Sequence, residues 1–234
     1  MKNRFGPPPH PWAVTPAEAI AIQRKLRHHV VLADHFAEVN YVAGVDAGFE
    51  EAGKTTRAAV AVLRFPALTL EECAIARVPT NFPYVPGLLT FREAPAILAA
   101  LEKLTRMPDL ILCDGQGIAH QRRFGIASHI GVITGLPCIG VAKNRLIGSH
   151  TDLMPEKGSM ARLIDRGEVV GVALRSRTGV KPIYVSPGHK ICLKTAIHYV
   201  LQCLSRFRLP ETTRWAHRLA SDMKVSKTFN PRLT

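Results

Sequence analysis

The stretch from Tyr41 to Val78, YVAGVDAGFEEAGKTTRAAVAVLRFPALTLEECAIARV, decides the fold class. It contains three strand-like runs that are separated by short turn segments: Tyr41–Ala47, Arg57–Phe65 and Thr69–Val78. Strands that are joined by short turns, with no helix between them, pair with their neighbours in antiparallel order. The stretch therefore predicts a three-stranded antiparallel meander.

The residues that follow the meander alternate between helical and strand-like patterns. Ala94–Leu104 places apolar residues at helical spacing, and Asp109–Cys113 (DLILC) is an apolar run typical of strands buried on both faces. Phe124–Ile133 is a second helical pattern, and Pro137–Ala142 is a second buried strand. Because helices alternate with strands here, we expect parallel strands beside the meander.

The two ends of the chain extend this α/β core. Thr15 to Glu18 (TPAE) combine a capping hydroxyl, an early proline and a glutamate, which predicts a helix that continues to about His29. After the second buried strand we expect two strands and two helices: Glu168–Leu174, Pro182–Ser186, Ile191–Leu204 and Glu211–Met223. We interpret residues 1–234 as a single domain, with a Pro-rich start and helix over residues 1–35, a C-terminal extension, and a basic tail over residues 221–234.

The charge balance favours a polyanionic partner. Thirty-one Lys and Arg residues stand against 18 Asp and Glu residues, which leaves a net charge of +13 and a pI near 10.0. Such a pI is typical of nucleic-acid-binding proteins and, less often, of proteins at a membrane surface. A charge that only keeps the protein soluble is the alternative.

The composition excludes several other classes. An apolar content of 47% is too high for a disordered chain. The longest apolar stretches, Ala58–Leu63 and Ile139–Ala142, are much shorter than the about 20 residues that span a bilayer. The N-terminus lacks the apolar segment of a secretory signal. The five cysteines form no C-x-x-C pair, so we expect no zinc or redox motif and a cytoplasmic location.

Two carboxylates fall on the predicted buried strands. Asp46 lies within Tyr41–Ala47, and Asp114 directly follows Asp109–Cys113. A buried carboxylate is unfavourable unless it is paired or binds a cation, and Mg²⁺ takes one or two protein carboxylates. The alternatives are a hydrogen-bonded buried aspartate at Asp46 and the start of a turn at Asp114. In a basic chain, the pair favours a phosphoryl-transfer site.

Three further residues carry weaker signals. Glu93 follows Thr90 by three residues, which also fits a capping box, although Pro95 favours a later start of the helix. Lys143 follows the second buried strand, where it is placed to meet a phosphate. His217 lies within a helical pattern. For Lys143 and His217 an ordinary surface side chain is the alternative.

The loop Pro83-Tyr84-Val85-Pro86-Gly87 holds one aromatic side chain between two prolines. Proline fixes φ, so the tyrosine is presented on a rigid segment. A rigid aromatic side chain is suited to enter a base stack. The alternative is a Pro-rich turn with a packed tyrosine.

Six segments together resemble the endonuclease V family: GVDAGF (Gly44–Phe49), NFPYVPGLLTFRE (Asn81–Glu93), LILCDGQGIAHQRRFGIASHIG (Leu110–Gly131), PCIGVAKNRLIG (Pro137–Gly148), YVSPGHK (Tyr184–Lys190) and RLPETTRWAHRLA (Arg208–Ala220). Their order and length make the resemblance more specific than any single short motif. It covers most of the chain, from about Val42 to Ala220.

The resemblance implies a ribonuclease H-like fold and a Mg²⁺-dependent nuclease, in which we expect Mn²⁺ to substitute. Such an enzyme nicks DNA near deaminated bases, chiefly deoxyinosine, at the second phosphodiester bond on the 3′ side. The implied metal ligands are Asp46, Glu93 and Asp114, and the implied further catalytic residues are Lys143 and His217. The resemblance also implies a wedge that fills the base stack, formed by Pro83, Tyr84, Val85 and Pro86. The implied base pocket contains Gly87, Leu89, Gly115, Gly117, His120 and Leu146, and contacts with the nucleic-acid backbone are implied for Ser186, His189 and Arg214.

Two other functions stay open at this point. One is a ribonuclease that acts on inosine in RNA, because a 2′-OH contact depends on fine geometry. The other is a non-catalytic nucleic-acid-binding protein, against which the three acidic residues argue. We expect a monomer that binds DNA with deaminated bases and does not bind membranes.

Overall fold

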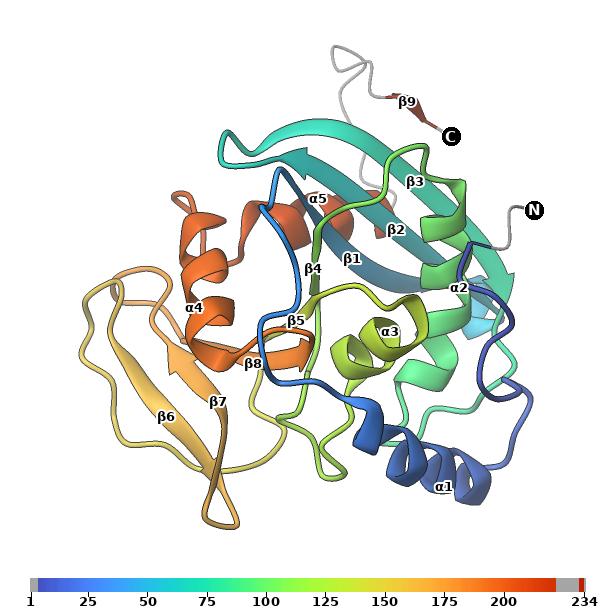
Figure 1. The fold of residues 1–234 in the computed structure, drawn as a ribbon, viewed down its shortest axis with the longest axis horizontal. Helices are drawn as coiled ribbons and strands as arrows, with labels where there is room; N and C mark the ends of the chain where they lie inside the picture. The colour runs from blue at the N-terminus through green and yellow to red at the C-terminus, as the bar shows by residue number, and fades with distance from the viewer. Residues whose placement is uncertain (1–3, 222–231, 234) are drawn as a thin grey trace.

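The computed structural model describes residues 4–221 and 232–233, and within them nine strands form one mixed sheet (Figure 1). Their order across the sheet is β6-β7-β8-β5-β4-β1-β2-β3-β9. The strands are β1 (Tyr41–Glu50), β2 (Thr55–Arg64), β3 (Thr69–Pro79), β4 (Leu110–Cys113), β5 (Cys138–Ala142), β6 (Met160–Asp165), β7 (Glu168–Leu174), β8 (Ile183–His189) and β9 (Arg232–Leu233).

The expected meander and the expected parallel strands are both confirmed. β1 pairs antiparallel with β2, and β2 pairs antiparallel with β3. β4 pairs in parallel with both β1 and β5, because helices connect these strands. Beyond them, β8 runs antiparallel to β5 and β7. This ribonuclease H-like arrangement puts β1 and β4 next to each other at the centre of the sheet.

Helices cover both faces of the sheet. They are α1 (Pro16–Leu26), α2 (Thr90–Lys103), α3 (Ile126–Thr134), α4 (Leu193–Gln202) and α5 (Glu211–Ala220), with short 3₁₀ turns at Arg27–His29 and Glu51–Gly53. α2 and α3 pack on the face of β1 that carries Ala43 and Val45. α4 packs on the opposite face, with Val42. α5 lies against β1 and β2.

Gly44 allows α5 to lie directly on β1. A Cβ at Gly44 would be 2.0 Å from the carbonyl oxygen of Thr212, so no larger residue fits while the helix keeps its place. Four residues further along the strand, a Cβ at Gly48 would be 3.3 Å from the carbonyl oxygen of Ala220. The C-terminal extension thus returns to the central strand and brings its helix beside Asp46.

Three details of the secondary structure differ from the expectations. α2 begins at Thr90 rather than near Ala94, and Pro95 lies inside it. β6 was not expected, because only Leu163 is fully buried in this edge strand and the other residues give no apolar alternation. The last expected helix ends at Ala220 rather than Met223, and residue 223 and most of the basic tail lie outside the described residues.

None of the described helices is both long enough and apolar enough to cross a membrane.

Candidate active site

Two aspartates meet at the centre of the sheet. In the parallel pair of β1 and β4, Val45 lies opposite Cys113, so the residues that follow them, Asp46 and Asp114, lie side by side. The amide of Asp114 donates to the carbonyl oxygen of Val45 at 3.1 Å, which fixes the backbone at this point. The meander and the βαβ connection therefore bring together two residues that are 68 positions apart in the sequence.

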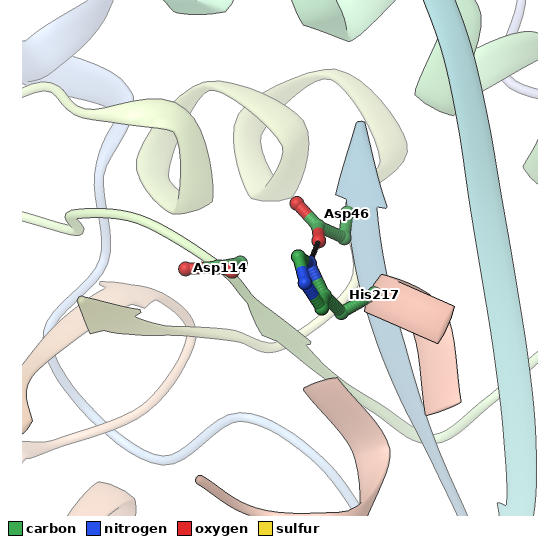
Figure 2. Close-up of side chains that lie close together, drawn as sticks. All are labelled: Asp46, Asp114 and His217. Carbon is green, nitrogen blue, oxygen red and sulfur yellow. Dashed lines mark hydrogen bonds and ion pairs between the residues drawn. The ribbon is translucent and has the colours of Figure 1, made fainter. Parts of the chain in front are cut away.

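His217 joins the aspartates from α5. Its Nδ1 lies 2.7 Å from Oδ2 of Asp46 (Figure 2). One ligand atom each of Asp46, Asp114 and His217 lie within 4.8 Å of one another, a spacing that can hold a metal ion. The sequence alone did not separate His217 from an ordinary surface histidine, because its partner lies on a distant strand.

Glu93 approaches the same region from the first turn of α2. Its side chain is buried, and α2 has no side-chain cap: its N-cap residue is Leu89. The capping-box alternative for Glu93 is therefore wrong. In a capping box the hydroxyl of Thr90 would accept a hydrogen bond from the backbone amide of Glu93. Here the hydroxyl bonds with Nδ1 of His129 at 3.1 Å. Glu93 is not part of the three-residue cluster with His217.

Lys143 places a positive charge beside the aspartates. It follows the end of β5, and its Nζ lies 2.5 Å from Oδ2 of Asp114. Both side chains are held from neighbouring strands, because β4 and β5 are paired in parallel. The structure thus brings Asp46, Asp114, Lys143 and His217 into one group of contacts.

Burial and mutual repulsion make this group of carboxylates unfavourable without a cation. Burial, and then the charge of Asp114, raise the pKa of Asp46 above its ordinary value. Burial, followed by the charges of Asp46 and Asp114, raises the pKa of Glu93 well above its ordinary value. Carboxylate oxygens are the ligands that Mg²⁺ prefers, and a divalent cation would offset the repulsion. The residues present therefore fit a hard divalent cation.

A cavity of about 360 Å³ opens beside the carboxylates. Asp114 and Lys143 line it, so the charged group and the cavity share a wall. Of the six residues expected in a base pocket, five line the cavity: Gly87, Leu89, Gly115, His120 and Leu146. Gly117 is not among its lining residues. A Cβ at Gly117 would be 2.0 Å from the carbonyl oxygen of Pro187, so this glycine lets the loop after β4 pack onto β8.

The loop with Tyr84 forms one rim of this cavity. Tyr84, Val85 and Pro86 line it, whereas Pro83 does not. The side chain of Tyr84 is 71% exposed, so the alternative of a packed tyrosine is wrong. Cζ of Arg92 lies 6.0 Å from the centre of the Tyr84 ring.

The three residues expected to contact a nucleic-acid backbone lie in different surroundings. Ser186 is buried and its Oγ accepts from the amide of Gly117 at 2.8 Å. His189 is also buried, and its Nδ1 accepts from the amide of Val31 at 3.3 Å. Arg214 is half-buried, and its Nη1 lies 2.6 Å from Oε2 of Glu211. Their contacts with a nucleic acid stay predictions.

Sequence reasoning missed two polar residues near the cavity. Gln23 of α1 is buried and lines the cavity, and its Oε1 accepts from Nε of Arg122 at 2.5 Å. A glutamine in an amphipathic helix and an arginine in a basic loop give no sequence signal for this contact, because the two residues are 99 positions apart.

The mixed sheet is ribonuclease H-like, and the acidic cluster beside its central strands can hold a metal ion, a combination typical of metal-dependent nucleases. The family model for Endonuclease V matches residues 24–218. An endonuclease V from Rippkaea orientalis is 63% identical over 205 residues, which cover 88% of this chain and 90% of the relative. The chain belongs to the Endonuclease V family, the deoxyinosine-specific endonucleases of DNA repair.

Solved structures agree with this assignment. The endonuclease V of Streptomyces avermitilis superposes with a TM-score of 0.85 at 45% identity, and the match covers 90% of this chain and 93% of that one. The endonuclease V of Ciona intestinalis, in complex with a 24mer DNA containing an inosine followed by a ribo-adenosine, has a TM-score of 0.76 at 28% identity. That match covers 88% of this chain and 96% of the other.

Proposed function

We propose that the protein binds DNA that contains deoxyinosine and nicks the second phosphodiester bond on the 3′ side of the lesion, with Mg²⁺ as its cofactor. One observation carries the proposal: Asp114 and Lys143 belong both to the charged group and to the wall of the 360 Å³ cavity. A base held in the cavity therefore lies close to the groups that act on a phosphate. The inosine-containing DNA in the complex of the Ciona intestinalis relative supports the choice of substrate.

Asp46, Asp114 and Glu93 are the proposed ligands of Mg²⁺, with Mn²⁺ as a substitute. A divalent cation at such a site lowers the pKa of a bound water and offsets negative charge on the phosphate. His217 keeps Asp46 in place through the bond at its Nδ1. Its Nε2 makes no hydrogen bond with the described residues and can orient a water. Lys143 places its ammonium group beside Asp114, where it can neutralise charge on the phosphate.

The cavity and the exposed tyrosine suit an extruded base. An enzyme that reads a base inside a duplex turns it out of the stack and binds it in a pocket. Hypoxanthine has a 6-oxo group and an N1–H where adenine has an amino group and an unprotonated N1, so donors and acceptors in the wall can distinguish them. Tyr84, on the rim of the cavity, is the proposed wedge that fills the space left in the stack.

The proposal also includes the oligomeric state, the domain organisation and the cellular compartment of the protein. We propose that the protein acts as a monomer. The nine described strands form one sheet, which supports a single domain. The five cysteines are free thiols, which fits a reducing compartment such as the cytoplasm.

A nicking assay tests the proposal. A duplex with one inosine and a 5′ label on the lesion strand is incubated with the protein and Mg²⁺, and the product length gives the position of the cut. We expect a nick at the second bond on the 3′ side, no nick with adenine at the same position, and no product in the presence of a chelator. Cleavage that ignores the inosine would contradict the proposed specificity.

Two comparisons sharpen this assay. Asp114→Asn should abolish nicking, whereas Asp152→Asn, the same change at an exposed position in the loop after β5, should not alter it. Matched DNA and RNA strands with one inosine compare the two substrates directly. Faster cleavage of the RNA strand would replace DNA repair with the alternative of an inosine-directed ribonuclease.

A further inference from the structure

Three side-chain donors converge on one backbone carbonyl at the end of the wedge loop, residues 83–87. The carbonyl oxygen of Gly87 lies 2.7 Å from Nη2 of Arg122, 2.9 Å from Nε2 of His120 and 3.1 Å from Nε2 of Gln23. A carbonyl oxygen has two lone pairs, so this one is fully engaged. The donors come from α1 and from the loop after β4, and they hold the wedge loop from two directions.

Gln23 has only one amide orientation that satisfies its neighbours. Its Oε1 accepts from Nε of Arg122 at 2.5 Å, and its Nε2 donates to the carbonyl oxygens of Gly87 and of Phe124, at 3.1 and 3.2 Å. A flipped amide would face two carbonyls with its oxygen and a guanidinium with its nitrogen. Because Gln23 is buried, these contacts are shielded from water and are correspondingly strong.

Gly87 allows this close approach. Its φ is +78°, which is accessible to glycine at little cost. A Cβ at this position would be 2.7 Å from Oε1 of Gln121 and 2.8 Å from Nη2 of Arg122. The backbone of the wedge loop therefore rests directly on the side chains of the neighbouring loop, three residues after Tyr84.

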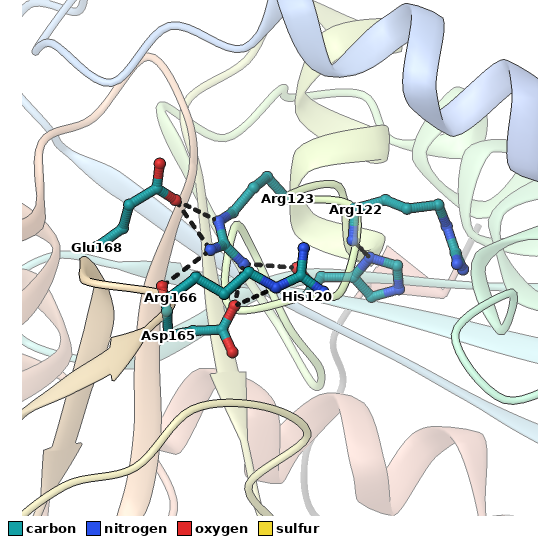
Figure 3. A network of polar contacts seen from close by, with 6 residues as sticks. All are labelled: His120, Arg122, Arg123, Asp165, Arg166 and Glu168. Atoms are coloured by element: carbon teal, nitrogen blue, oxygen red, sulfur yellow. Dashed lines mark hydrogen bonds and ion pairs between the residues drawn. The ribbon is translucent and has the colours of Figure 1, made fainter.

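The neighbouring loop is itself fixed on its other side by Arg123 (Figure 3). Nη1 of Arg123 lies 2.8 Å from Oδ2 of Asp165, and Nη2 lies 2.8 Å from Oε2 of Glu168. Nη1 also donates to the carbonyl oxygen of His120 at 3.2 Å. Figure 3 shows the side chain of Arg122 on the opposite side of the loop from these contacts. The turn between β6 and β7 thus supports the segment that holds the wedge loop.

We propose that Gln23 and Arg122 are positioning residues that fix the wedge loop through the carbonyl of Gly87, an inference that rests on the proposed function. The site is built in advance: the tyrosine is exposed, and its loop is held by buried and paired side chains. A wedge that is held in place loses less conformational freedom when it enters a base stack. Recognition of inosine in a duplex therefore depends on Gln23 and Arg122, whereas recognition in a single strand, which has little stack to fill, depends on them less.

Three substitutions test this proposal in the full-length chain. Arg122→Lys keeps the charge and removes the fork that bonds both Gln23 and Gly87. Gln23→Glu keeps the size and the acceptor for Arg122 but removes the donor to Gly87. Arg24→Lys is the matched control, because the side chain of Arg24 is exposed on α1 and makes no hydrogen bond with the described residues, and lysine keeps the charge that acts on Arg122. Thermal melting shows whether each variant is folded. If the buried charge of Gln23→Glu unfolds the chain, the result with Arg122→Lys alone tests the proposal.

The expected result is a loss that is confined to the duplex. Arg122→Lys and Gln23→Glu should lower cleavage of inosine in a duplex roughly tenfold, the effect of about 1.4 kcal/mol, and change cleavage of the single strand less than threefold. In the Tyr84→Ala background, Arg122→Lys should have almost no further effect, because the residue whose position it sets is absent. Arg24→Lys should behave as the unchanged protein does.

Two results would overturn the positioning role. One is an equal loss on the duplex and on the single strand, and the other is a full tenfold loss that persists in the Tyr84→Ala background. A separate signal keeps the inference distinct from the proposed function. The fluorescence of 2-aminopurine beside the inosine rises when the stack opens, and it should rise less with Arg122→Lys even if the unchanged protein binds but does not nick. An unchanged rise in that case rejects the inference.

Discussion

Nδ1 of His217 lies 2.7 Å from Oδ2 of Asp46, across 171 residues of sequence. The contact joins the C-terminal helix α5 to the central strand β1, and it occupies one oxygen of an aspartate whose other oxygen, Oδ1, accepts from the amide of Ala47 at 2.8 Å. Asp46 is thus held in a single orientation beside Asp114. The position of α5 is therefore a condition for the geometry of the proposed metal site.

Removing the imidazole should lower catalysis more than binding. We expect His217→Ala to reduce the nicking rate by about 100-fold or more, since positioned acid–base and orienting groups contribute on this scale. His217→Asn should recover part of this loss, because its amide can donate to Asp46 where Nδ1 does. The measurement is single-turnover nicking at saturating protein, with a gel-shift assay for inosine-DNA binding. An unchanged rate in His217→Ala would remove this residue from the active site.

Two glycines of β1 provide a graded test of how α5 is seated. Gly44→Ala places a methyl group where the carbonyl oxygen of Thr212 lies, so we expect a loss of stability of about 3 kcal/mol or more and an impaired active site. At Gly48 there is more space between β1 and α5, so Gly48→Ala should lower the free energy of unfolding by about 1 kcal/mol or less. Urea denaturation of both variants measures the difference. Equal effects would show that α5 is not held by its contact at Gly44.

Tyr84 should matter most in a duplex. Stacking between a base and an aromatic ring is worth ~1–3 kcal/mol, so Tyr84→Ala should reduce cleavage of inosine in a duplex by about ten- to a hundredfold. The reduction should be smaller on a single strand, and Tyr84→Phe should be mild. Because the side chain is largely exposed, the melting temperature should not change. A variant that unfolds, or that loses activity equally on both substrates, would contradict the wedge.

The basic surface should bind DNA without sequence preference. Arg214 and Arg218 line a groove beside His217, with Phe207. For duplex DNA, the logarithm of the affinity should fall linearly with the logarithm of the salt concentration, with a slope near −0.9 per phosphate contacted. Arg218→Gln should make this slope shallower by about one unit and weaken binding to inosine DNA and to normal DNA equally. Affinity that does not vary with salt would exclude this role of the charge.

Buried histidines should make the fold sensitive to acid. Burial lowers the pKa of His120 to about 4 and the pKa of His189 to about 4, from an ordinary value of 6.5. Between these values the unfolded chain binds protons that the folded chain does not, so stability is fully present above pH 6.5 and is lost as the pH falls toward 4. Each such histidine lowers the free energy of unfolding by up to about 1.4 kcal/mol per pH unit inside this window.

The check is urea denaturation at several pH values between 4 and 7. His189→Gln removes one titrating group, and its side-chain oxygen can still accept from the amide of Val31, so the dependence on pH should become shallower. Gln202→Asn, a change at an exposed position without a titratable group, serves as the control and should leave the slope unchanged. If His189→Gln has the same slope as the unchanged protein, His189 is not one of the acid-sensitive groups.

Local patterns in the sequence were sufficient for most of the fold. The meander and the two parallel strands follow from short-range signals, because a strand buried on both faces is apolar over its whole length and a short turn forces antiparallel pairing. The sequence does not predict β6, for the converse reason. This strand lies at the edge of the sheet and buries few residues, so its sequence has no apolar pattern typical of a strand. The expected start of α2 near Ala94 is wrong, because packing of the apolar face of this helix outweighs the preference of Pro95 for the first helical position.

The sequence by itself identified the residue types of the site and, through family resemblance, their positions. It determined that Asp46 lies within a buried strand and that Asp114 directly follows one, since the neighbouring residues along the chain are apolar. Only the tertiary structure decided which groups meet: His217 with Asp46, Lys143 with Asp114, and Gln23 with Arg122. The physical reason is that hydrogen bonds and ion pairs act over about 3 Å in space, whereas the sequence patterns that encode strands and helices extend over only a few neighbouring residues.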